Sequence, residues 1–345
     1  MIKKMIKTEN AVGKLICHDI TKIEKGQFKG ALFKKGHRVR PEDVKALLDI
    51  GKKHIYTLQL EKGELHEDEA GERLAEALAG NGLKVGKPAE GRLDLEAKYA
   101  GLFKVDISRL HRLNSIPDVV VATLHNNSPL REGEKVAGAK VIPLVVKDDT
   151  LVEVEKICSE SGPPMQVIPY KQFKIGAIIT GMEIAEGRIK DGFAPVLEDK
   201  TRHYGQVKPL IKFAGDDVEE ISTKISQLLA EGCSMVVTTG GMSVDPDDVT
   251  PTAIKASGAE IIKYGAPALP GAMFLLAYKG DVPIIGLPAC AMYFQNTVLD
   301  ILLPRLLAGE RVTASEIAAL GHGGLCRRCE TCFFPRCSFG KSNFC

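Results

Sequence analysis

The chain has 345 residues, which is enough for about two or three domains rather than one. Hydrophobic residues make up 44% of it and charged residues 26%, which is typical of a soluble globular protein with ample core material. The net charge of +2 excludes a strong overall field for nucleic acid, so any anion site must be local. The N-terminus is too polar for a signal peptide, and no segment has the roughly 18 consecutive apolar residues of a membrane helix. We therefore expect a cytoplasmic protein with no nucleic-acid or membrane partner.

Residues 1–90 are expected to form a small α/β region. Pro41 and the acids after it predict a helix that Gly51 ends, because proline and acids favour the first turn and glycine the stop. A strand over His54–Leu60 and a helix over Glu67–Leu78 follow. His66 and the acids behind it lack the HExxH spacing of a metal site, so we expect them to open the second helix.

Residues 91–170 are expected to form a middle region with β-strands. The β-branched run Asp118–Leu124 predicts one strand. Val141–Val146 predicts another, at a sheet edge because Pro143 interrupts it. The other features predicted here are a turn-rich stretch over 131–140, a helix over Leu151–Ser159 and a linker at Ser161–Pro164.

Residues 171–312 alternate apolar strands with amphipathic helices, which predicts a mostly parallel, three-layer αβα sheet domain behind the smaller α+β and β-rich N-terminal regions. The predicted strands are Ile175–Thr180, Met235–Thr239, Glu260–Tyr264, Met273–Tyr278 and Pro283–Leu287. The predicted helices are Asp217–Leu229, Pro251–Ser257 and a long final helix over Ala291–Leu307.

The stretch after the strand Met235–Thr239 has the composition of an anion-binding loop. Ligands of open parallel sheets bind beyond the carboxyl ends of the strands. Gly240 and Gly241 allow backbone N–H groups to approach an anion, while Thr239 and Ser243 add hydroxyl donors. Thr250 is expected to be the N-cap of the next helix.

Three carboxylates lie in the same loop, at Asp245, Asp247 and Asp248. Acids are not phosphate ligands, but they fit a site where a divalent metal bridges them to the phosphate or where one accepts a hydrogen bond from an N–H group of the ligand. The alternative is that they are ordinary turn and capping residues. The combination of strand, glycines, hydroxyls, acids and a capped helix favours the binding site.

Residues 313–345 form a Cys-rich tail that predicts a metal centre. Five of the nine cysteines lie in the last twenty residues. Cys326, Cys329, Cys332 and Cys337 follow one another at spacings that suit an iron–sulfur cluster, and slightly less well structural zinc. Cys345 is a spare or alternate ligand. Cys17, Cys158, Cys233 and Cys290 are scattered, so core packing is the default for each.

These motifs resemble the molybdopterin-binding domain shared by molybdopterin adenylyltransferases, gephyrin-type molybdopterin molybdotransferases and competence-damage proteins. The residues that carry the resemblance are the strand end Thr180-Gly181-Met182-Glu183, the loop Thr239–Ser243, the Asp248–Pro251 motif, and the turns Pro270-Gly271 and Gly286-Leu287-Pro288. The N-terminal region resembles the entry region of molybdotransferases more loosely. Two departures are Asp245, where molybdotransferases have glycine, and Ala289-Cys290-Ala291, where they have Gly-Asn-Pro.

The resemblance implies a transferase that binds molybdopterin or its adenylylated form and inserts molybdate with the help of Mg²⁺. It implies Asp248 and, secondarily, Asp245 as catalytic residues. The residues implied to bind the cofactor are Thr239, Gly240, Gly241, Ser243, Thr180, Gly181, Glu183, Pro270, Gly271, Gly286 and Pro288. It also implies a homodimer and a molybdoenzyme as a further partner. The alternatives are adenylyl transfer or nucleotide diphosphate hydrolysis, and a non-catalytic cofactor carrier or redox-sensing protein.

Overall fold

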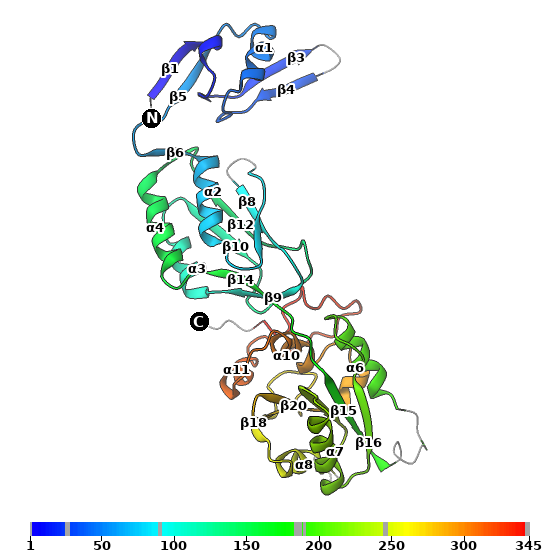
Figure 1. The fold of residues 1–345 in the computed structure, drawn as a ribbon. Coiled ribbons are helices and arrows are strands. Elements are labelled where there is room, and N and C mark those ends of the chain that lie inside the picture. Colours follow the sequence, from blue (N-terminus) through cyan, green and yellow to red (C-terminus); the bar gives the residue numbers. More distant parts are fainter. Residues whose placement is uncertain are drawn as a thin grey trace.

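The computed structural model describes residues 2–24, 28–88, 92–182, 188, 191–243 and 248–341. Figure 1 shows its elements in three groups that follow one another along the molecule in chain order. Among the helices of these residues, none combines the length and apolarity needed to cross a membrane.

The N-terminal group packs two small antiparallel sheets and one helix around a core that includes Ile16, Leu47 and Ile55. The predicted helix and strand are both present, and Gly51 follows the helix with a φ of 79°. The elements are β1 (Ile2–Lys7), η1 (Thr8–Asn10), β2 (Leu15–Ile16), β3 (Ile20–Glu24), β4 (Phe28–Phe33), α1 (Pro41–Asp49) and β5 (His54–Gln59).

The middle group builds its core between helices and antiparallel sheets. The second predicted helix has the predicted bounds, and His66 caps it by accepting a 3.3 Å hydrogen bond from the Asp68 backbone N–H. The elements are β6 (Glu64–His66), α2 (Glu67–Leu78), β7 (Leu83–Val85), β8 (Arg92–Ala97), β9 (Gly101–Val105), α3 (Ile107–Asn114), β10 (Val119–Thr123), β11 (Pro129–Leu130), β12 (Lys135–Val141), β13 (Val145–Lys147), α4 (Asp148–Ser159) and β14 (Met165–Pro169).

Three predictions for this group were wrong. The strand expected over Val141–Val146 is interrupted, since Val141 ends β12 and Val145 begins β13. The turn-rich stretch over 131–140 is mostly the strand β12, which pairs with β10 on one side and β8 on the other. Its small residues, Ala137, Gly138 and Ala139, weaken the strand signal of the sequence but let α2 pack closely against the sheet. The segment 161–164 is not a linker out of this group, because β14 follows it directly and pairs with β9.

The C-terminal group is a six-stranded sheet with the order β16-β15-β17-β20-β19-β18. β16, β15, β17 and β20 pair in parallel, and only β19 runs against the other strands. The elements are β15 (Ile175–Thr180), α6 (Phe193–Arg202), β16 (Leu210–Ala214), α7 (Val218–Ala230), β17 (Met235–Thr239), α8 (Thr250–Ala256), β18 (Glu260–Tyr264), β19 (Leu275–Lys279) and β20 (Val282–Leu287).

Side chains that alternate along the strands fill two separate cores, one on each face of this sheet. Ile175, Ala177 and Ile179 face the core under α6 and the last helices, whereas Ile178 faces the core under α7 and α8. The sheet therefore has helices on both faces, which confirms the predicted mostly parallel αβα architecture (Figure 1).

The predicted long final helix is wrong. The chain forms a short helix α9 (Cys290–Tyr293), breaks, and starts α10 (Val298–Leu307) with Thr297 as a capping residue. The Thr297 backbone N–H and hydroxyl both donate to the Asp300 carboxylate, which satisfies the new helix start. A further helix, α11 (Ala314–Ala319), lies at the start of the segment 313–345, which was expected to be a Cys-rich tail.

Charged side chains join the middle group to the end of α10. Lys104 on β9 donates a 2.6 Å hydrogen bond to the Glu310 carboxylate. Glu310 also accepts a 2.6 Å bond from the buried guanidinium of Arg305, which pairs in addition with Glu316. Arg305 is only 5% exposed, so its charge is largely removed from water and depends on the two carboxylates.

Replacing Arg305 by Ala is expected to lower the free energy of unfolding by about 3–5 kcal/mol, because the half-buried carboxylates of Glu310 and Glu316 would both lose their bond to this guanidinium. Glu310 would keep Lys104 alone. Urea unfolding followed by circular dichroism measures this change. Arg202→Ala is the control: its side chain is 63% exposed and pairs with Glu198 at the surface, so a loss of about 0.2–1 kcal/mol is expected. Equal losses for the two variants would contradict the buried role of Arg305.

Candidate functional site

Three parallel strands end side by side at one edge of the six-stranded sheet. Ile179 pairs with Thr239, and Thr239 pairs with Leu287, so the ends of β15, β17 and β20 are in register. The loops predicted to bind the ligand leave the sheet at these ends. The sheet therefore gathers three of the predicted segments, those around Thr180, Thr239 and Gly286, at a single edge.

The chain passes closest to its neighbour strand at Gly240. The Thr180 hydroxyl donates a 2.8 Å hydrogen bond to the Thr239 carbonyl oxygen, which draws the start of the loop onto the end of β15. Gly240 has a φ of 84°, and a Cβ atom there would lie 2.5 Å from Thr180 Oγ1 and 2.9 Å from the Thr180 carbonyl oxygen. Only glycine fits this position, both for its backbone conformation and for space.

The carbonyl groups of the loop are held by the protein. Thr250 donates to the Gly240 oxygen through its hydroxyl, at 2.9 Å, and to the Gly241 oxygen through its backbone N–H, at 3.2 Å. The Tyr264 hydroxyl donates to the Met242 oxygen at 3.0 Å. Since N–H and C=O point in opposite directions across a trans peptide, the N–H groups of Gly241, Met242 and Ser243 are turned away from these partners. Successive N–H groups directed together are what an anion requires.

The role predicted for Thr250 was wrong in one respect. It was expected to be the N-cap of the following helix, but Thr250 is the first residue of α8 and Val249 precedes it without a side-chain cap. Its hydroxyl is used by the Gly240 carbonyl instead. The residue therefore shapes the loop rather than the helix start.

Thr239 carries a buried polar atom without a partner. Its side chain is 0% exposed, and its hydroxyl oxygen makes no hydrogen bond to any part of the chain that the structure describes. The neighbouring hydroxyl of Thr238 is also buried but donates to the Ile285 carbonyl at 3.1 Å. A buried hydroxyl without a hydrogen bond is unfavourable, so its presence at a loop of this kind points to a ligand.

Of the two acids predicted to be catalytic, the structure describes Asp248. It lies partly buried between the loop and α8, near Tyr264. Burial raises the pKa of the Tyr264 hydroxyl, and the negative charge of Asp248 raises it further. Asp245, and also Glu183 on the neighbouring loop, lie outside the described residues. Ser243 is exposed, at the end of the part of this loop that the structure describes.

The turns around Pro270 and Gly286 approach the same edge. A Cβ atom on Gly286 would lie 2.8 Å from the sulfur of Met242, so the glycine turn packs under the anion loop. Gly271 packs against Val298 at the start of α10. Burial raises the pKa of the Cys290 thiol, and a hydrogen bond from the Gly271 backbone opposes this rise. The Pro270–Gly271 turn is thus next to the residues that follow Pro288.

The four cysteines predicted to bind metal line one pocket, but they are not arranged around a single ion. Cys329 and Cys332 are exposed, and Cys326 and Cys337 are half-buried. No three His, Cys, Asp or Glu side chains of the described ranges come together closely enough to hold a metal ion. All four thiols are free rather than disulfide-bonded, and Cys345 lies outside the described residues.

Sequence reasoning missed several residues that shape these sites. Tyr264 and Met242 were not singled out. Tyr264 donates a hydrogen bond to the predicted anion loop, and Met242, within that loop, packs against Gly286. Gln295 and Asn296 were assigned to a continuous helix, whereas they line the cysteine pocket. The Thr297–Asp300 pair has the spacing of a helix start, and this signal could have placed the break.

Two family models match the chain. Residues 176–308 match the family described as "Probable molybdopterin binding domain". Residues 5–59 match a family described as a domain of unknown function (DUF8806). The first match covers the six-stranded sheet and its predicted ligand loops, so these residues form a molybdopterin-binding domain.

Relatives share parts of the chain. A CinA-like protein of Mycobacterium sp. (strain JLS) is 33% identical over 90 residues, which are 26% of this chain and 21% of that protein. A molybdopterin molybdenumtransferase of Synechococcus elongatus is 23% identical over 188 residues, which are 52% of this chain and 46% of that protein. The crystal structure of the molybdopterin biosynthesis enzyme MoaB of Thermus thermophilus is 19% identical, with a TM-score of 0.32, and the match covers 40% of this chain and 98% of that chain. The chain thus spans less than half the length of either curated relative.

Replacing Gly240 by Ala is expected to lower the free energy of unfolding by about 2–4 kcal/mol, because the new Cβ would meet Thr180 as well as adopting a left-handed backbone. Gly232→Ala is a matched control, since Gly232 has a φ of 83° and nothing within 4 Å of an added Cβ. Urea unfolding gives the loss of unfolding free energy for each variant, and the difference between the two losses is the contribution of the close contact. If Gly240→Ala loses no more unfolding free energy than Gly232→Ala, the loop does not depend on its approach to Thr180.

Proposed function

We propose that this chain, whose residues 176–308 form a molybdopterin-binding domain, binds molybdopterin or its adenylylated form at the edge formed by β15, β17 and β20 and acts at the molybdate insertion step of molybdenum cofactor biosynthesis. The observation that carries the proposal is the buried, unpartnered hydroxyl of Thr239 at the start of the Gly240–Ser243 loop. It is a hydrogen-bond donor that the described part of the chain leaves unused.

The loop suits the phosphate of such a ligand. The N–H groups of Gly241, Met242 and Ser243 are directed away from the carbonyl partners that fix the loop, and they would donate to phosphate oxygens together with the hydroxyl of Thr239. Because that hydroxyl has no exposed surface, the loop must shift slightly as the ligand enters, which its paired glycines permit. Thr180, Gly181 and Glu183 on the neighbouring strand end, and the Pro270-Gly271 and Gly286–Pro288 turns, would form the rest of the binding surface.

Asp248 is proposed to be the principal catalytic acid, with Asp245 as the second. Carboxylates beside a phosphate site fit a magnesium ion shared between them and the phosphate oxygens. When bound, Mg²⁺ would neutralise charge that develops at the diphosphate linkage of adenylyl-molybdopterin. Asp248 would orient that ion, while the loop N–H groups hold the phosphate in place.

The choice of molybdate insertion rests on the similarity to the Synechococcus molybdenumtransferase, which extends beyond the molybdopterin-binding domain to 52% of this chain. We further propose a homodimer and a molybdoenzyme that receives the finished cofactor. Adenylyl transfer is the rival reaction, since Asp248-Val249-Thr250-Pro251 resembles an adenylyltransferase motif.

Thr239→Val removes the hydroxyl while keeping the shape of the side chain. We expect the affinity for molybdopterin to fall by about tenfold, as for the loss of a hydrogen bond to a charged group, while the free energy of unfolding stays equal or rises. Thr238→Val is the control. Its affinity for molybdopterin should be unchanged and its free energy of unfolding should fall, because the Thr238 hydroxyl already bonds to Ile285. Anaerobic fluorescence titration and urea unfolding measure the two effects. Unchanged affinity in Thr239→Val would remove the main support for the site.

Asp248→Ala is expected to slow turnover by about a hundredfold or more without preventing folding or binding. The assay incubates the full chain anaerobically with adenylyl-molybdopterin, Mg²⁺ and molybdate and measures AMP release that requires molybdate. Asp281→Ala is the control, since this acid is fully exposed in the turn between β19 and β20.

The same assay separates the alternatives. Pyrophosphate release from ATP and molybdopterin would identify adenylyl transfer instead. Tight binding with no product from either substrate pair would show a carrier. A fully active Asp248→Ala variant would contradict the role given to this acid.

A further inference from the structure

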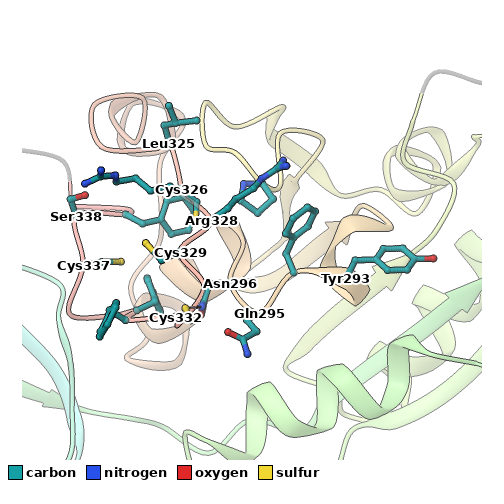
Figure 2. Close-up of a pocket in the computed structure, with 16 residues that line it drawn as sticks. Tyr293, Gln295, Asn296, Leu325, Cys326, Arg328, Cys329, Cys332, Cys337 and Ser338 are labelled. Carbon is teal, nitrogen blue, oxygen red and sulfur yellow. Dashed lines mark hydrogen bonds between the residues drawn. The ribbon is translucent and has the colours of Figure 1, made fainter.

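The C-terminal cysteines converge on a pocket that their sequence spacing alone does not create. Cys326, Cys329, Cys332 and Cys337 all line it, together with Tyr293 at the end of α9 and residues 294–296 of the break between α9 and α10. Figure 2 shows the cysteines gathered toward one end of the pocket and Tyr293 at the other. The pocket offers about 230 Å³, whereas a single water needs about 10–15 Å³, so it has room for a polyatomic group.

The pocket shared by the four thiols favours a cluster over a single ion. A zinc site requires its sulfurs at about 2.3 Å from one atom, which brings all of them within van der Waals contact. In the described ranges, no three His, Cys, Asp or Glu side chains form a group that could hold one metal ion. In a cubane cluster each thiolate binds a different iron, so the sulfurs stand further apart around a central core. Four cysteines that line one pocket of about 230 Å³ suit this second kind of centre.

The groups around the pocket suit an anionic centre. Asn296 donates a 2.8 Å hydrogen bond from Nδ2 to the sulfur of Cys332, the kind of bond that orients a thiolate ligand. Arg327 and Arg328 supply positive charge at the pocket wall. Arg328 has a φ of 52°, unusual for a residue with a side chain, and its guanidinium stacks 5.1 Å from the Phe294 ring. This left-handed residue turns the chain between Cys326 and Cys329 so that both line the pocket.

The cysteine segment is also tied to a ligand loop of the molybdopterin-binding domain. The Leu269 N–H donates to the Gly324 oxygen at 2.7 Å, and the Cys326 N–H donates to the Leu269 oxygen at 2.9 Å. The next residue is Pro270, the first of the Pro270–Gly271 turn and itself part of the pocket wall. Phe339, near the far end of the segment, is buried in the core that lies under α6 and the last helices.

We propose that Cys326, Cys329, Cys332 and Cys337 bind a [4Fe–4S] cluster in this pocket, and that the cluster fixes the Pro270–Gly271 turn through the Leu269–Cys326 backbone bonds. On binding, the four thiols release their protons and each thiolate forms a bond to a different iron. The site does not depend on the reaction proposed for the domain.

The first test is metal analysis of the full chain purified anaerobically or reconstituted with sulfide and equal amounts of ferrous and ferric iron. We expect about four iron atoms and four acid-labile sulfides per chain, a broad visible absorption, and an electron paramagnetic resonance signal on reduction. Cys329→Ser and Cys332→Ser, both at exposed positions, should each lose most of the cluster, whereas Cys17→Ser outside the pocket should retain it.

Several results would overturn the cluster. These are stoichiometric zinc without sulfide, a disulfide among the four cysteines in the anaerobic protein, or unchanged iron in both pocket variants. Thr239→Val should keep its full iron content. The molybdopterin affinity of this variant therefore tests the proposed function, whereas iron content tests the cluster proposal.

The second test is amide hydrogen exchange of the cluster-loaded protein and of Cys329→Ser. Exchange at Leu269 and Cys326 is expected to become at least about tenfold faster without the cluster, because their shared bridge would open more often. The Gly265 amide, which bonds to Phe274 in the same connection but not to the cysteine segment, should be unchanged. Equal protection at Leu269 in both proteins would refute the anchoring role.

Discussion

The close approach of Gly240 to Thr180 sets the geometry of the predicted ligand edge. β15 and β17 are adjacent parallel strands, so the chain leaving β17 must cross the end of β15 without a side chain in the way. Once it does so, the next carbonyls reach Thr250 and Tyr264, and Met242 comes to rest on Gly286. The loop, the first turn of α8 and the turn after β20 are therefore a single backbone unit.

The threonine hydroxyls of this unit differ in whether they form hydrogen bonds within the protein. Those of Thr180, Thr238 and Thr250 all donate to backbone carbonyls and hold the strands and the loop together. Thr239 stands among them with the same burial and no partner in the described chain. A hydroxyl without a structural use, surrounded by hydroxyls that have one, is a feature that folding alone does not explain.

The break between α9 and α10 links the molybdopterin-binding domain to the cysteine segment. Thr297 and Asp300 start a new helix where an apolar pattern would continue the old one. The residues released by this break form one wall of the cysteine pocket, and the Pro270–Gly271 turn contributes to another. Further along α10, Arg305 ties the same helix to Glu310 and so to Lys104 of the middle group. The cysteine pocket and the contact between groups thus both depend on where this helix begins.

Elements whose signals are local could be predicted from the sequence. The bounds of α2, β15, β17 and β18 follow from period and composition, because each is a continuous apolar or amphipathic run between clear stop signals. It also placed the ligand loops together, since the ends of parallel strands must meet at one edge. The roles of those residues in binding and catalysis remain predictions.

Features that depend on distant neighbours could not be predicted without the three-dimensional fold. β12 is a strand because β8 and β10 pair with it on both sides, although its alanines and glycine carry little strand preference. Thr250 serves Gly240 rather than capping α8, because the loop brings that carbonyl within reach. The cysteines surround a pocket because the helix break and the Leu269–Cys326 bridge hold them there. In each case a contact across many residues outweighs a local preference of a few tenths to about 1 kcal/mol, and no local pattern records that contact.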